Sequence, residues 1–285
     1  MKKILLPTDF SDCGQGSIDF AASLAKKING EIHLLSVYER ENEYPVYNTS
    51  GEWSRLANAT AEVPMVAESL KEIKTQLEAV KEKPALKGLV VYDHIELGDP
   101  AVQINNYAEK HNMDILVMGT CGINGSKEKM IGKHAAKVAK NIHCPMLSIP
   151  ESSSALPRKI LFATDFSEEA DRAFGFVKYF AGIFDATIHL LTVITKDKFE
   201  SFAESRNKIH DFRDRHGIGH IQYTIYNDHL KEAGILHFAK EMEADLIALG
   251  SPGKRGLARF YNPGISMDMT NHIFCPVLTV NSKKS

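Results

Sequence analysis

The sequence predicts an α/β protein made of two tandem, doubly wound domains, each with a five-stranded parallel sheet. Three observations support this fold class. The opening KILLPTDF at residues 3–10 returns as KILFATDF at residues 159–166, so the chain contains an internal repeat. Within each copy, short apolar runs typical of strands alternate with segments of helical periodicity. The connections are short, and such alternation is typical of a parallel sheet covered by helices on both faces.

The repeat extends along most of the chain. A Cys-Pro pair at Cys144 near the end of the first copy returns at Cys275 near the end of the second. The spacing between the copies shortens in the middle, so the second copy lacks roughly 25 residues between its second and fourth strands. A polar segment that ends in a proline, 151–157, separates the copies. We therefore predict two domains, at residues 1–150 and 157–285.

The first elements follow directly from the apolar pattern. Lys3–Pro7 is a compact apolar strand, and Ser11 or Asp12 is expected to N-cap the helix that follows. The next strand is Ile32–Val37. The helix between the two strands has an apolar face at helical spacing, made of Ile18, Ala21, Ala22, Ala25 and Ile28.

The rest of the copy begins with an irregular segment at about 39–61, which contains Trp53. This segment is either a lid over the site or a contact with the second copy. The elements after it alternate to the end of the copy, as a helix at about 64–82, a strand at 88–96, a helix at 100–111, a strand at Ile115–Met118, a helix at about 132–142 and a strand at Met146–Ile149.

The composition is that of an ordinary globular protein. The 285 residues carry a formal net charge of −2, which offers no general attraction to nucleic acid or to an anionic membrane. No apolar stretch is long enough to cross a bilayer. The four cysteines are scattered without a CxxC pair, as is typical of reduced intracellular thiols. We expect a cytoplasmic protein that binds neither nucleic acid nor membranes.

Unusual residues gather at the ends of the first and fourth strands. In open parallel sheets, ligands bind beyond the carboxyl ends of the strands where the winding reverses, and this reversal places strands one and four side by side. Pro7, Thr8 and Asp9 end the first strand, and Met118 and Gly119 end the fourth. These two segments are the expected binding edge.

A glycine-bearing loop follows the fourth strand. Gly119, Gly122 and Gly132 allow the backbone to approach a ligand closely and to point free N–H groups at phosphate oxygens. A helix that starts at Gly132 aims its positive dipole end at the same place, and Lys133 adds charge. The sequence thus predicts a phosphate-binding loop.

The spacing Gly-x2-Gly-x9-Gly after a strand resembles the ATP-binding signature of the universal stress protein family. The Pro-Thr-Asp segment at 7–9 and the terminal Cys-Pro-hydrophobic strands also resemble that family, so the resemblance covers nearly the whole chain twice. It implies a fold like that of the adenine nucleotide alpha hydrolases, with strand order 3-2-1-4-5. It also implies that the last strands of the copies, Met146–Ile149 and Val277–Val280, pair with each other as a pseudo-dimer.

The same resemblance implies that the first copy binds an adenine nucleotide, ATP or its relatives AMP and ADP. Asp9 and Val37 would border the base and the ribose, Met118 would lie beneath them, and the three glycines would hold the phosphates. The residues expected to bind are Pro7, Thr8, Asp9, Val37, Met118, Gly119, Thr120, Gly122, Gly132, Lys133 and His134.

Two departures from the family pattern affect this expectation. Lys133 stands where the family has Ser or Thr, so a point charge replaces a hydroxyl and Mg²⁺ coordination is in question. In the second copy Pro263 stands at the place of the third glycine, and proline has no N–H to offer a phosphate. We therefore expect a weaker second site, made of Thr164, Asp165, Val193, Gly250, Gly253 and Gly264.

Several residues have a second interpretation. Asp9 and Asp165 are suited to cap the helices that follow them. His33 and His189 occupy equivalent strand positions, where we expect hydrogen-bonded or edge-exposed side chains. The histidines between 210 and 237 fit no metal-binding spacing, so we expect a solvated surface and no metal. The basic residues of the second loop are equally consistent with phosphate binding and with solvation, namely Lys254, Arg255 and Arg259.

The sequence therefore predicts a tandem universal stress protein, an ATP-binding regulator of the stress response. It contains no recognised catalytic motif, so we expect no catalytic residues and no dedicated enzyme activity. Two alternatives remain open, a ligand-free interaction scaffold and a slow ATP hydrolase. A homodimer of the whole chain is also possible.

Overall fold

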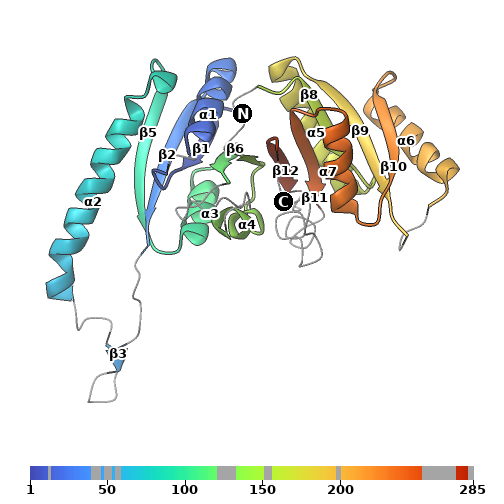
Figure 1. The fold of residues 1–285 in the computed structure, drawn as a ribbon. Coiled ribbons are helices and arrows are strands. Elements are labelled where there is room, and N and C mark those ends of the chain that lie inside the picture. Colours follow the sequence, from blue (N-terminus) through green and yellow to red (C-terminus); the bar gives the residue numbers. More distant parts are fainter. Residues whose placement is uncertain are drawn as a thin grey trace.

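The computed structural model describes residues 1–11, 14–39, 46–47, 53–54, 59–120, 133–150, 156–196, 200–251 and 274–281. These residues form one ten-stranded sheet, flanked by helices, and a separate two-stranded sheet (Figure 1). The predicted α/β class with two doubly wound units is confirmed.

In the first copy the strands lie in the order β7-β6-β1-β2-β5, and all neighbours are parallel. Numbered along the copy, this is the predicted order 3-2-1-4-5. The strands are β1 (Lys3–Pro7), β2 (Glu31–Tyr38), β5 (Val90–Leu97), β6 (Ile115–Gly119) and β7 (Met146–Ile149).

The second copy repeats this order as β10-β9-β8-β11-β12. It joins the first copy where β12 pairs antiparallel with β7, with Thr279 opposite Met146 and Val277 opposite Ser148. The sheet is therefore continuous across both copies. The strands are β8 (Lys159–Ala163), β9 (Thr187–Ile194), β10 (Gln222–Asn227), β11 (Leu246–Ser251) and β12 (Val277–Asn281).

Helices cover both faces of the sheet. Ile4 and Leu6 of β1 belong to a core cluster with α1, whereas Leu5 between them belongs to a cluster with α3 and α4. Side chains alternate along a strand, so these clusters lie on opposite faces. The helices are α1 (Gln15–Ile28), α2 (Ala59–Lys81), α3 (Pro100–Lys110), α4 (Lys133–Ala139), α5 (Glu168–Phe184), α6 (Phe202–His216) and α7 (Lys231–Glu241).

The start of α1 differs from the prediction. The helix begins at Gln15 with Gly14 as its N-cap and no side-chain cap, so the capping role predicted for Ser11 or Asp12 is wrong. Asp12 itself lies outside the described residues. The chain makes a turn before the helix, in which the Gly14 N–H donates to the Ser11 carbonyl at 2.9 Å.

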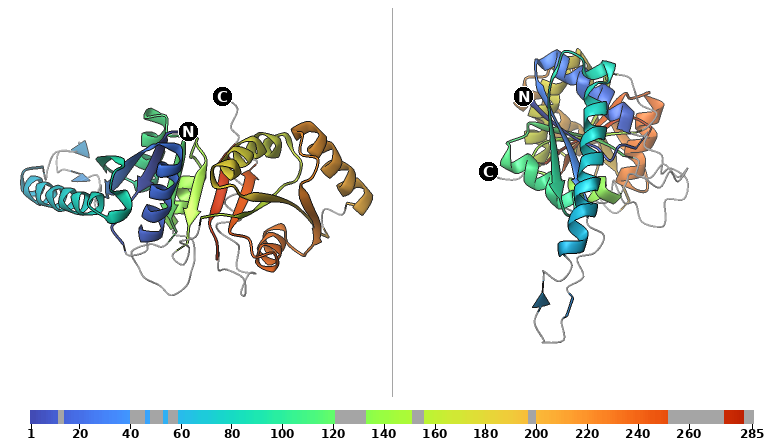
Figure 2. Two further views of the ribbon diagram at one scale, coloured as in Figure 1. Left: turned by 90° about the horizontal axis from the view of Figure 1, so that it is seen from above. Right: turned by 90° about the vertical axis from the view of Figure 1, so that its left-hand side faces the viewer.

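The helices around the glycine loop and the irregular segment also differ in extent. α2 starts at Ala59 rather than near Pro64, because the alanines and glutamate before the proline are themselves good helix formers. α4 ends at Ala139, short of the predicted 142. Within the segment predicted to be irregular, β3 (Val46–Tyr47) and β4 (Trp53–Ser54) pair antiparallel. This small sheet and α2 lie at the end of the molecule far from the second copy (Figure 2).

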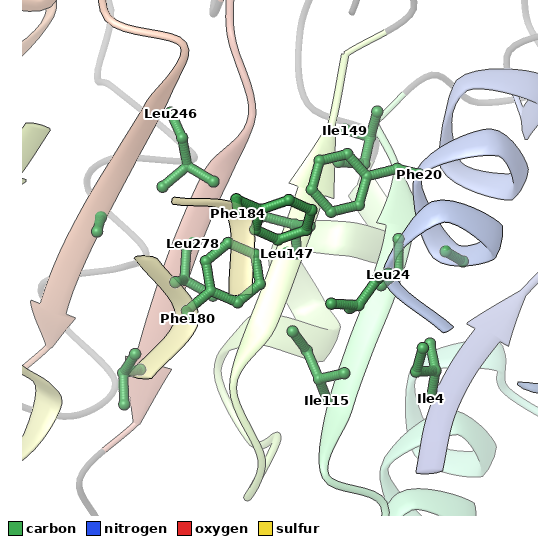
Figure 3. Close-up of a cluster of buried hydrophobic side chains, with 14 of the residues drawn as sticks. Ile4, Phe20, Leu24, Ile115, Leu147, Ile149, Phe180, Phe184, Leu246 and Leu278 are labelled. Atoms are coloured by element: carbon green, nitrogen blue, oxygen red, sulfur yellow. The ribbon is translucent and has the colours of Figure 1, made fainter. Parts of the chain in front are cut away.

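One of the core clusters extends across both copies. Phe20 of α1 and Phe184 of α5 face each other with ring centroids 5.7 Å apart, above Leu147 of β7 and Leu278 of β12 (Figure 3). The Lys27 ammonium lies 5.7 Å from the centroid of the Phe184 ring, within cation–π distance. The two copies therefore share buried apolar surface as well as a strand pair.

Candidate functional site

The predicted binding edge begins with the direct pairing of β1 and β6. Ile4 lies opposite Ile115 and Leu5 opposite Leu116. Because parallel strands end at the same edge of a sheet, the segment Pro7–Asp9 and the segment Met118–Thr120 emerge side by side. The prediction that strands one and four are neighbours is confirmed.

Thr8 and Asp9 build the turn between β1 and α1. The Thr8 Oγ1 accepts the Phe10 N–H at 3.1 Å, and the Asp9 Oδ1 accepts the Ser11 N–H at 3.1 Å and the Ser11 hydroxyl at 2.6 Å. Phe10 has a positive φ of 61°, which these bonds stabilise. Asp9 is exposed and does not cap α1, so the capping interpretation is wrong. Its Oδ2 has no hydrogen-bond partner among the described residues.

The second copy forms the same turn. The Thr164 Oγ1 accepts the Phe166 N–H at 2.9 Å, and the Asp165 Oδ1 accepts the Ser167 N–H at 3.1 Å. The cap of α5 is Ser167, whose hydroxyl accepts the Ala170 N–H, so Asp165 does not cap the helix either. The repeated Thr-Asp-Phe sequence therefore shapes a strand-to-helix turn in both copies.

The other predicted residues of the first site fall partly within the described chain. Val37 and Met118 both pack against the core cluster under α3 and α4. Thr120 is buried just after the end of β6. His134 lies in the first turn of α4, with its Nδ1 buried and without a partner among the described residues. Lys133 begins α4. Two of the predicted glycines lie outside the described residues, Gly122 and Gly132.

In the second copy, packing accounts for Gly250. A Cβ on Gly250 would lie 2.9 Å from the Ala173 Cβ and 3.0 Å from the Ala170 Cα, so α5 packs directly on the backbone of β11. Val193 is buried at the end of β9. The remaining predicted glycines, Gly253 and Gly264, lie outside the described residues. A ligand contact of Gly250 stays a prediction, since the glycine is required whether or not a ligand binds.

The structure also brings together three histidines that the sequence did not connect. The expected hydrogen-bonded role of His33 is confirmed, with its Nδ1 2.9 Å from the Tyr107 hydroxyl. The ring centroid of His33 lies 5.8 Å from that of His94 and 6.3 Å from that of His111, and the last two are 6.0 Å apart. In the described part of the chain, no group of three or more potential ligand side chains is placed to hold a metal ion.

Acid should destabilise the protein through this histidine cluster. Burial, followed by the charges of His33 and His111, lowers the pKa of His94 below 6.5, and burial together with Lys110 and His33 lowers the pKa of His111. The unfolded chain therefore binds more protons than the folded one as the pH falls below 6.5, so the free energy of unfolding decreases there. Chemical unfolding between pH 7 and 5 measures this loss.

The variant His94→Gln removes one titrating ring from the cluster. We expect its stability to fall less steeply over the same pH range than that of the wild type. The exposed His143, which lies 3.6 Å from Glu109, provides a control, and His143→Gln should keep the wild-type slope. Equal slopes for wild type and His94→Gln would contradict the assignment.

Comparison with known proteins agrees with the fold and the repeat. The sequence profile of the Universal stress protein family matches residues 1–150 and again residues 157–281. Universal stress protein Slr1230 of Synechocystis is 22% identical over 98% of this chain and 99% of its own length. Universal stress protein MJ0531 of Methanocaldococcus jannaschii is 30% identical over 52% of this chain and 81% of its own length.

A solved structure agrees over the full length. A universal stress protein from Archaeoglobus fulgidus superposes with a TM-score of 0.64 at 22% identity, covering 98% of this chain and 96% of the other. Within the described residues, no helix is both long enough and apolar enough to cross a membrane. The chain therefore belongs to the Universal stress protein family and carries two domains of this family in tandem.

Proposed function

We propose that the first domain binds an adenine nucleotide, ATP or its relatives ADP and AMP, and that the protein acts as a nucleotide-dependent regulator of the cytoplasmic stress response. The observation that supports the proposal most strongly is the pairing of β1 with β6, which brings Pro7–Asp9 and Met118–Thr120 to one edge of the sheet. Ligands of open parallel sheets bind at this kind of edge.

The residues at this edge suit the parts of a nucleotide. Asp9 uses its Oδ1 for the turn and keeps its Oδ2 for a ribose hydroxyl. Val37 and Met118 offer apolar surface to the base. The buried Nδ1 of His134 has no partner in the described chain, and a phosphate oxygen would satisfy it. Lys133 would supply charge to the phosphates in place of a hydroxyl, without the need for Mg²⁺.

We propose one site per chain, because the second domain has lost part of the pattern. Pro263 offers no N–H where the third glycine is expected. In this proposal the domains at 1–150 and 157–285 act as one body, since β7 and β12 pair and the two domains share a hydrophobic core.

Calorimetric titration with ATP, with and without Mg²⁺, tests the proposal with a matched pair of variants. Asparagine keeps the Oδ1 acceptor that the turn needs, so Asp9→Asn removes the charge without removing the turn. We expect one site in the wild type and a loss of affinity of at least about tenfold in Asp9→Asn, since a hydrogen bond to a charged group is lost.

The control is Asp165→Asn, which makes the same change in the turn of the second domain. We expect wild-type affinity from this variant. The absence of binding heat from the wild type would refute the proposal and favour a ligand-free scaffold, for which the replacement of the family hydroxyl by Lys133 is the supporting observation. Incubation with labelled ATP separates a passive binder from a slow hydrolase, and we expect no turnover.

A further inference from the structure

The turn from β10 into α7 differs from its counterpart in the first domain. Both turns begin alike, because the Gly98 N–H donates to the Tyr38 carbonyl at 3.0 Å and the Asp228 N–H donates to the Ile194 carbonyl at 3.1 Å. Asp228 therefore occupies the place of Gly98. The second turn then contains an additional residue, His229, before the helix begins.

The glycine and the side chain that packs against it have changed places between the two domains. In the first domain, Gln103 of α3 fills the space beside Gly98, where a Cβ would lie 3.0 Å from the Gln103 Nε2. In the second domain the helix residue is Gly234, and a Cβ there would lie 3.0 Å from the Asp228 Cβ. The space is thus filled by an amide from the helix in the first domain and by a carboxylate from the turn in the second.

The carboxylate of Asp228 is held in one orientation. Its Oδ2 lies 2.7 Å from the His237 Nδ1, and its Oδ1 accepts the His229 N–H at 2.6 Å. Burial alone would raise the pKa of Asp228, but the hydrogen bonds from His237 and from the backbone lower it below its ordinary value. The Asp228 side chain is only 12% exposed, whereas that of His237 is 44% exposed. The imidazole thus has a fixed ring orientation and a free Nε2.

This pair borders an open surface cavity of about 470 Å³ at the carboxyl ends of β9 and β10. That volume lies in the range of small-molecule sites. Lys196, His229 and His237 contribute the groups that can carry positive charge, and Asn227 adds an amide. Asp228 is the one carboxylate among the described lining residues, and hydrogen bonds already occupy both its oxygens. Among the described lining residues, the Lys196 ammonium therefore has no carboxylate partner and can attract an anion.

We propose that this cavity binds a small anion that bears a phosphate or carboxylate group. The Lys196 ammonium contacts the anion. The His237 Nε2–H also donates to it when the ring is an imidazolium, because the Nε2 of the neutral ring is itself an acceptor once Nδ1 donates to Asp228. Asp228 is a positioning residue that orients the imidazole. The site is independent of the proposed nucleotide site, because it lies in the other domain and uses neither β8 nor β11.

Titration of the full-length protein by NMR, following the ring proton signals of the histidines, tests the proposal. The probes are inorganic phosphate and acetate, which represent the two kinds of anion, added at constant ionic strength against sodium chloride. We expect a saturable shift of the His237 signal with at least one probe, and a reduction in affinity of about tenfold or more in Lys196→Ala and in His237→Gln. Binding to His237→Gln is measured by calorimetry, because this variant lacks the imidazole signal.

Asp171 and His216 supply the control, because they form another carboxylate–imidazole pair in the same domain, at 3.1 Å, that joins α5 to α6. His216→Gln should bind the probe as the wild type does. In Asp228→Asn, we expect the pH dependence of anion binding to shift. A thermal unfolding midpoint for this variant shows separately that the domain is folded. A non-saturable response, or equal binding in wild type, Lys196→Ala and His237→Gln, would overturn the proposal. Because Asp9→Asn leaves this site intact, failure of the nucleotide proposal is recognised separately.

Discussion

Replacing Phe184 with alanine lowers the free energy of unfolding by about 3–5 kcal/mol, the usual cost of removing a buried aromatic ring. The side chain is 2% exposed and contacts Phe20 across the junction of the two domains and Phe180 on its own helix. The alanine leaves a cavity in a core to which both domains contribute. Urea unfolding followed by circular dichroism measures the change.

Phe202 provides the control, because it is a phenylalanine of the same domain that is 64% exposed. Phe202→Ala should leave the unfolding midpoint close to that of the wild type. We expect a single transition in the wild type, since the domains share their core. Two separate transitions, of which Phe184→Ala moved only one, would show that the shared core does not couple the domains.

Replacing Gly250 with valine destabilises the second domain by at least about 1–3 kcal/mol, the cost of overpacking a dense interior. Even the first added carbon would lie 2.9 Å from the Ala173 Cβ, and it would also press on the backbone of α5 at Ala170. The helix would have to move away from β11. Unfolding in urea without any nucleotide measures the effect, so a ligand plays no part in it.

Gly175 of α5 provides a control in which the free energy of unfolding is expected to change in the opposite direction. A Cβ on Gly175 would meet no atom within 4 Å, and the residue lies inside a helix. Gly175→Ala should therefore raise the free energy of unfolding by roughly 0.5–1 kcal/mol. If Gly250→Val unfolded with the wild-type midpoint, the explanation of this glycine by helix packing would be wrong.

The fold was predictable because its signals are local and repeated. The apolar strands such as Lys3–Pro7 and Met146–Ile149 are buried on both faces, so they read as short continuous runs, and their observed bounds equal the predicted ones. The start of α1 was not predictable in the same way. The Thr8 and Asp9 side chains accept backbone N–H groups of the turn, and the first helical residue, Gln15, comes after the polar residues that resembled caps.

The sites were predictable only in part. The edge at Asp9 followed from strand order, which the repeat and the alternation of elements indicate. The histidine cluster did not, because His33 and His94 meet through the pairing of β2 with β5 and His111 arrives at the end of α3. Likewise, Asp228 and His237 are joined by a turn with one extra residue, which no spacing rule identifies. Such contacts depend on register between distant segments.

The antiparallel junction of β7 with β12 has a geometric consequence for any ligands. All strands of one domain run opposite to those of the other. The carboxyl ends of the strands of the two domains therefore lie at opposite edges of the sheet. The proposed nucleotide site and the proposed anion site therefore lie at opposite edges of the continuous sheet. A molecule bound at one of these edges therefore leaves the other edge open to solvent.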